Sequence, residues 1–185
     1  MIVLILLIPA ALLLAPGRAP VVLTAAQKQE SVKHLDDVKS KITEIKLDQK
    51  QKKTIKPYQL RMTEQDINTF IGMDEQVKDI ITKNKLEDVF VKIESGQIKA
   101  YGSRYVRGVM MHGTLEAVPT INDQHRLAMK ISALKTGSLG LPQGLAAKLT
   151  DEFSDKVLNK LFDPGLKLNT VEIESDAIVV TGDSK

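Results

Sequence analysis

The hydrophobic pattern of the chain first has the period of a helix. Within residues 27–56, apolar side chains recur every three or four positions, which predicts a Lys-rich helix with one narrow apolar stripe. The stripe consists of Val32, Leu35, Val38, Ile42 and Ile45. It either lies on a folded module or pairs with another chain, and it is too short to define a coiled coil.

A strand and two short helices are predicted next. Residues 57–62 alternate between apolar and polar side chains, as a strand does. Thr63 is a good helix N-cap, with Asp66 at the third helical position, close to a capping box. We expect this helix to break at Gly72 and a second one to end near Asn84.

From residue 89 the period becomes two. Alternating stretches predict four strands, over residues 89–94, 98–106, 109–117 and 127–133. Closely linked strands with one apolar and one polar face form an antiparallel meander. A loop is expected over residues 119–124. Glycines at positions 102, 108 and 113 predict bulges or strong curvature.

The last third of the chain predicts a long amphipathic helix and a hairpin. The helix runs from Pro142 to Phe162, and Asp163-Pro164-Gly165 ends it. Its apolar face is formed by Leu145, Leu149, Phe153, Val157, Leu158, Leu161 and Phe162. Strands over 166–174 and 177–181 close the module. The predicted fold class is therefore α+β, a curved antiparallel sheet wrapped on a long amphipathic helix, with an N-terminal helical segment.

The first 26 residues read as a signal peptide or a membrane anchor. Ile2 to Ala15 carry no charge, and this length suits the apolar core of a signal peptide better than a membrane span, which needs about 20 residues. No Lys or Arg precedes the run, and Pro9 and Pro16 interrupt it, so cleavage and retention both stay open. We expect an exported protein of the periplasm or cell envelope, tethered through its N-terminus if uncleaved. A buried helix of a soluble domain is the weaker alternative.

Composition narrows the function classes. The 185 residues carry a net charge of +3 from 26 basic and 23 acidic side chains, a mixed surface that does not suit nucleic acid. With no cysteine, the chain has no disulfides, thiolate metal sites or cysteine nucleophile. The basic cluster of residues 50–53 contacts anionic lipid head groups or, as we favour, is a solvated helix end.

No catalytic constellation is apparent. His34, His112 and His125 have no partner at a metal-ligand spacing, and His112 reads as an isolated surface histidine. The acidic neighbours Asp36-Asp37 and Asp151-Glu152 point about 100° apart on a helix, so we interpret them as solvated. We expect no enzyme, no cofactor and no metal.

A resemblance adds to this reading. The segment Leu60-Arg61-Met62-Thr63-Glu64-Gln65-Asp66-Ile67-Asn68 is similar to a strand followed by a T-E-x-x-[IL]-N helix start. Further along, the meander is followed by Gly137-Ser138-Leu139-Gly140-Leu141-Pro142, the predicted amphipathic helix and a closing hairpin, an order that is also similar. Over about residues 57–183 the chain resembles small bacterial envelope proteins of the YpmS-like and LmeA-like type and the lipoprotein YceB. These are related in shape to the tubular lipid-binding (TULIP) superfamily.

The resemblance implies an apolar groove between sheet and helix that binds a lipid or another hydrophobic molecule. Leucine and methionine side chains without an ionic anchor suit an alkyl chain. The predicted lining is Val91, Ile93, Met111, Leu115, Met129, Ile131, Leu149 and Phe153. Expected partners are this ligand, the membrane surface and a further envelope protein. The alternative function is a tethered structural or interaction module with a filled core.

Overall fold

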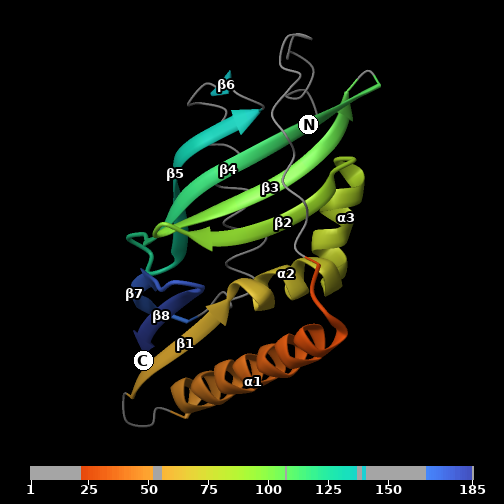
Figure 1. Ribbon diagram of the computed structural model, residues 1–185. Coiled ribbons are helices and arrows are strands. Elements are labelled where there is room, and N and C mark those ends of the chain that lie inside the picture. The colour runs from red at the N-terminus through yellow and green to blue at the C-terminus, as the bar shows by residue number, and fades with distance from the viewer. Residues whose placement is uncertain (1–21, 52–55, 107, 137–138, 141–165, 185) are drawn as a thin grey trace.

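The computed structural model describes residues 22–51, 56–106, 108–136, 139–140 and 166–184 (Figure 1). Its helices are α1 (Ala25–Lys50), α2 (Glu64–Met73) and α3 (Glu75–Lys83). Its strands are β1 (Pro57–Thr63), β2 (Glu87–Glu94), β3 (Gln97–Val106), β4 (Val109–Ile121), β5 (Leu127–Thr136), β6 (Leu139–Gly140), β7 (Leu168–Ile173) and β8 (Ala177–Asp183). The α+β class is confirmed. The predicted helix from Pro142 to Phe162 lies outside the described residues.

The strands form two antiparallel sheets, whereas the sequence predicted one. The large sheet has the order β2-β3-β4-β5-β6, which confirms the meander, and the small sheet has the order β1-β8-β7. Prediction of a single sheet was wrong because β1 pairs with β8, with Met62 opposite Ile178. Periodicity shows which side chains share a face, but it does not show which distant strand is the neighbour.

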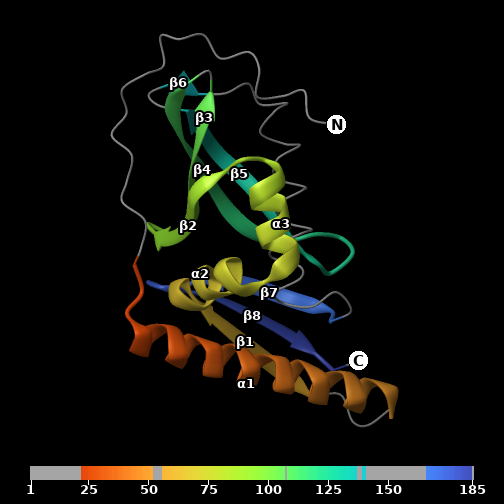
Figure 2. The ribbon, with the colours of Figure 1, turned by 90° about the vertical axis from the view of Figure 1, so that its right-hand side faces the viewer.

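Helix α1 covers the small sheet. In both views it runs beside β1, on the side of the small sheet that is remote from the large sheet (Figures 1 and 2). Thr24 and Gln27 form a reciprocal capping box at its start. One hydrophobic cluster, which we call the common core, contains buried residues of α1, α2, α3 and both sheets. The stripe residues Leu35, Val38, Ile42 and Ile45 belong to it, and Val32 is partly exposed. The apolar stripe of α1 therefore packs on the folded module, which was the first of its two predicted alternatives.

The break between α2 and α3 falls at Asp74. Its carboxylate accepts hydrogen bonds from the backbone N–H groups of Gln76 and Val77, each at 3.0 Å, so it caps α3. The predicted break at Gly72 was wrong, because a glycine only weakens a helix whereas a side-chain cap starts a new one. The predicted N-cap Thr63 and the helix end near Asn84 are confirmed.

The large sheet departs from simple alternation at two bulges. In β2 the register shifts between Glu87 and Phe90, opposite Gly102, and in β5 the shift places Ser132 as the extra residue. The second bulge moves Ala133 to the face opposite Ile131. Gly113 lies opposite Gly102 without a bulge, and Gly108 has the positive φ of the β3–β4 turn.

Strand β4 continues past the predicted loop start. Pro119 pairs with Met129, and the turn is confined to the residues after Ile121. Prediction of a loop from residue 119 was therefore wrong for its first three positions. Proline is tolerated there because the pairing of β3 with β4 ends at Ala117, so no β3 carbonyl needs its missing N–H.

Candidate functional site

One face of the large sheet collects the predicted lining residues. The register places Ile93, Ile98, Ala117 and Ile131 in one row across four strands, and Val91, Ala100 and Leu115 in the next. Met111 and Met129 lie further along β4 and β5 on the same face. We call this the inner face. It contains six of the eight predicted residues; Leu149 and Phe153 lie outside the described residues.

The inner face has a packed half and an open half. Val91, Ile93 and Met129 are buried members of the common core, and Ile131 packs against it. Met111 and Leu115 are partly exposed and do not belong to that core. They lie toward the β3–β4 hairpin, whose strands extend beyond the helices in Figure 1. Met111 and Leu115 are thus two partly exposed apolar side chains of the inner face that lie outside the common core of the described residues.

Arg104 also lies on the inner face, which the sequence reasoning missed. It pairs with Met111 across β3 and β4. Its Nε atom is buried and has no hydrogen-bond partner. A signal was present, because Arg104 follows Ile98, Ala100 and Gly102 at intervals of two. The prediction of a lining without an ionic anchor considered only apolar positions.

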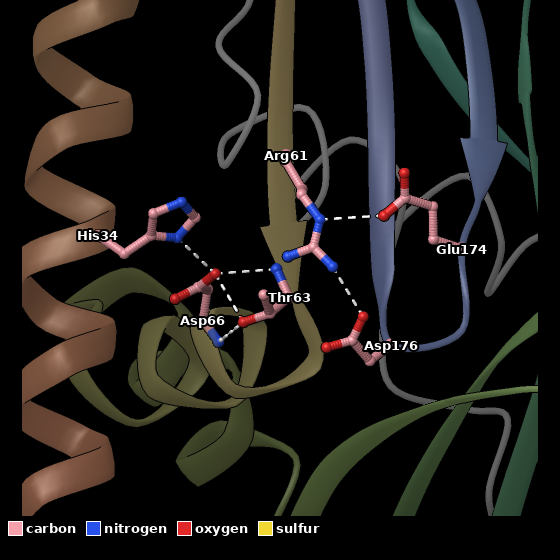
Figure 3. Close-up of polar contacts among 6 residues, drawn as sticks. All are labelled: His34, Arg61, Thr63, Asp66, Glu174 and Asp176. Carbon is pink, nitrogen blue, oxygen red and sulfur yellow. Dashed lines mark hydrogen bonds and ion pairs between the residues drawn. The ribbon is translucent and has the colours of Figure 1, made fainter.

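The helix start predicted at Thr63 acts as a structural junction (Figure 3). Asp66, with 2% of its side chain exposed, accepts hydrogen bonds from the Thr63 backbone N–H at 2.8 Å and from the Thr63 hydroxyl at 2.7 Å. Nδ1 of His34 from α1 lies 2.7 Å from the same carboxylate oxygen. The contact with Asp66 therefore joins the Lys-rich helix to the start of α2, and His34 is not isolated.

Two further residues of this helix start bind the free edge of β2. The Asn68 amide donates to the Val91 carbonyl at 2.8 Å and accepts from the Val91 N–H at 2.7 Å. Glu64 accepts from the Ile93 N–H at 2.8 Å. These three bonds occupy backbone groups of β2 that a neighbouring strand would otherwise use. Helix α2 thereby fixes β2, and with it the edge of the inner face.

Arg61 fixes the closing hairpin of the small sheet. Its Nε lies 3.0 Å from Glu174 and its Nη2 lies 2.7 Å from Asp176, on either side of the β7–β8 turn (Figure 3). The hydrogen bond to Glu174 is the main cause that raises the pKa of Arg61. The group is exposed, so this pair positions the turn and adds little stability.

A second apolar surface runs beside α1. Two adjoining hollows, of about 320 and 390 Å³, share Leu35, Lys39 and Phe70 as lining residues. We call them the α1 groove. Leu47 and Met73, which are 51% and 45% exposed, line its two ends. Periodicity could not predict this groove, because it forms only where α1 meets α2 and β1.

The described residues offer no assembled catalytic or metal site. No group of three His, Asp or Glu among them is arranged to hold a metal ion. Asp36 and Asp37 are exposed, as predicted, and Nδ1 of His125 lies 3.2 Å from the Leu168 carbonyl oxygen. No helix within the described part of the chain is long and apolar enough to cross a membrane.

Comparison with known protein families identifies the chain. The family model described as LmeA-like phospholipid-binding matches residues 17–183, which include both sheets and α1. The chain belongs to the LmeA-like phospholipid-binding family. No curated protein and no solved structure matches it significantly.

Membership of the LmeA-like family confirms the resemblance seen in the sequence and extends it. The match begins well before Pro57, so the Lys-rich helix α1 is part of the LmeA-like unit and not an addition to it. The family is described by the binding of a phospholipid, not by a reaction. The TULIP relationship and the wrapping of the sheet on a long helix stay predictions.

Proposed function

We propose that this LmeA-like protein is a non-enzymatic phospholipid-binding protein that holds an acyl chain against the inner face of the large sheet. One observation carries the proposal: six residues chosen as a lining from the sequence share this face, and Met111 and Leu115 remain outside the packed core. Partly exposed methionine and leucine side chains on one face suit a flexible hydrocarbon. The predicted helix, through Leu149 and Phe153, would cover the chain from the other side.

The cellular setting is part of the proposal. The apolar run from Ile2 to Ala15 supports export to the periplasm or cell envelope, with or without a retained tether. The membrane surface is the proposed source of the lipid. Tyr105 and Val109, near the β3–β4 turn, are 56% and 37% exposed. A tyrosine and an aliphatic side chain at one exposed hairpin end suit contact with a membrane interface.

Adjacent methionines provide a matched test of the inner face. Met110 and Met111 are neighbours in β4, both are partly exposed, and they point to opposite faces of the sheet. In the full-length protein stripped of lipid, Met111→Asp should weaken binding of a fluorescent phospholipid about tenfold or more, since a carboxylate there opposes an acyl chain. Met110→Asp should change the affinity little. Equal effects of the two substitutions would contradict the inner-face site.

A second candidate function is a tethered interaction module with a filled core. The α1 groove favours it, because Leu47 and Met73 expose apolar surface at both of its ends. A photo-crosslinking residue at Leu47 would then capture one defined envelope protein in cells, whereas the same residue at the exposed Glu44, outside the groove, would not. A full-length protein that binds no phospholipid, together with specific crosslinking at Leu47, would favour this alternative.

A further inference from the structure

The inner face carries one cation among its apolar side chains. Arg104 is two residues before the end of β3, directly opposite Met111. Its neighbours on the same face of β3 are Gly102 and Ala100, and Leu115 lies opposite Ala100. Arg104 therefore stands at the hairpin end of the inner face, beside Met111 and on the same face as Leu115.

The guanidinium of Arg104 has no partner among the residues that the structure describes. Its Nε atom is buried, and no hydrogen bond or ion pair joins this side chain to another described residue. The chain pairs other cations with acids: Arg61 contacts two carboxylates, and Lys135 lies 2.9 Å from Glu116. A buried donor of a charged group without an acceptor is unfavourable, and such groups are rare in folded proteins. The missing acceptor is best supplied by a ligand.

We propose that Arg104 binds the phosphate of the phospholipid whose acyl chain lies along Met111 and Leu115. This inference rests on the proposed function and names its polar contact. A guanidinium is always charged and offers N–H groups in a planar fork that matches two phosphate oxygens. Beside an apolar surface, where competing water is scarce, that pairing is stronger than on an exposed surface.

The dimensions of the face agree with this placement. Met111 and Leu115 are four residues apart in one strand, which corresponds to about 13 Å at the usual strand rise. One leaflet of a bilayer contains about 15 Å of hydrocarbon, half of the whole core. A head group at Arg104 therefore allows one acyl chain to extend past Leu115 to the edge of the packed core. The exposed side chain of Val109, on the same face as Met111, would then flank the entrance.

The test separates recognition of the phosphate from recognition of the chain. Lipid-free full-length protein is titrated with fluorescent phosphatidylglycerol and with fluorescent diacylglycerol of the same acyl composition. The unsubstituted protein should prefer the phospholipid. Arg104→Met should weaken phosphatidylglycerol binding about tenfold and leave diacylglycerol binding unchanged. Arg104→Lys, which keeps the charge but loses the fork, should fall between the two.

The exposed Arg126, in the turn after β4, provides the control, and Arg126→Met should bind both lipids normally. Two results would show that Arg104 is not the phosphate contact. In the first, Arg104→Met binds both lipids as the unsubstituted protein does; in the second, Arg104→Met and Arg104→Lys each lose both lipids equally. Either result leaves the proposed lipid site in place. If the unsubstituted protein binds neither lipid, the proposed function itself is wrong. Calorimetry with inorganic phosphate tests whether Arg104 binds free phosphate or the phosphate of a lipid. Arg104-dependent binding of inorganic phosphate, without a preference for phospholipid over diacylglycerol, would overturn the proposal that the phosphate belongs to a lipid head group.

Discussion

At the residue scale, Gly182 in β8 marks the tightest contact of the small sheet. A Cβ atom at this position would lie 2.3 Å from the Lys167 carbonyl oxygen and 2.4 Å from the Tyr58 hydroxyl. Gly182→Ala should therefore lower the free energy of unfolding by about 1–3 kcal/mol, the usual cost of overpacking. Gly113→Ala, whose Cβ would meet nothing closer than 3.8 Å, is the control for the change of residue type. Urea unfolding of both variants checks this, and equal midpoints would contradict it.

Tyr58 makes the same region sensitive to high pH. Burial, and then the nearby charge of Asp183, raise the pKa of Tyr58 from 10.0 to about 12. Because the pKa is raised in the folded state, the stability that this group contributes is complete below pH 10 and is lost as the pH rises through 12. Unfolding free energies of the unsubstituted protein should thus fall between pH 10 and 12.

The substitution Tyr58→Phe should make that fall smaller, at the cost of the hydrogen bond to the Lys167 carbonyl, about 1 kcal/mol. Tyr105→Phe, at an exposed position, should leave the pH dependence as it is. An unchanged slope in Tyr58→Phe would show that other groups cause the alkaline loss.

At the element scale, Asn68 holds α2 on the edge of β2. Asn68→Ala removes both hydrogen bonds to Val91 and leaves backbone groups of a buried residue without partners, which costs about 1–3 kcal/mol. Amide hydrogen exchange should accelerate at Val91. The same substitution at the exposed Asn169 should change stability by less than about 0.5 kcal/mol. Normal protection of Val91 in Asn68→Ala would show that packing alone fixes the edge.

Local signals predicted the elements better than their assembly. Thr63 and Asp66 form the expected cap because both partners lie within one helical turn. Glu64 and Asn68 belong to the same segment, yet their partners lie 29 and 23 residues further along, and no local rule reveals such a contact. The six lining residues on the inner face were predictable because strand alternation survives as long as bulges are few. Arg104 obeyed the same alternation and was missed only because polar positions were assigned to solvent.

At the scale of the whole molecule, the two sheets differ in how completely they are buried. The small sheet, α1 and α2 form a closed core around Leu60, Met62, Ile178 and Val180, which are almost fully buried. The large sheet shares that core through Val91 and Ile98 but leaves its hairpin end less covered. A phospholipid at the proposed site would therefore contact the large sheet and leave the closed core of the small sheet in place.

Because the ligand is proposed to bind only the folded state, it should stabilise the whole molecule by mass action. At a free phospholipid concentration of 100 times the dissociation constant, the gain is about 2.7 kcal/mol. For a chain of this length that gain raises the melting temperature by about 5–10 °C. Scanning calorimetry of the full-length protein, with short-chain phosphatidylglycerol added below its micelle concentration, measures the shift.

Arg104→Met should show a smaller shift at the same lipid concentration, and diacylglycerol should shift both proteins alike. Met110→Asp, which changes the opposite face, should keep the full shift and so serves as the control. Mass action requires the shift to grow with the lipid concentration, so no shift, or one that does not grow, would mean that the lipid does not bind the folded state at a defined site. In that case the open end of the inner face would be surface without a ligand, and α1 with its groove would be the part of this LmeA-like protein that meets a partner.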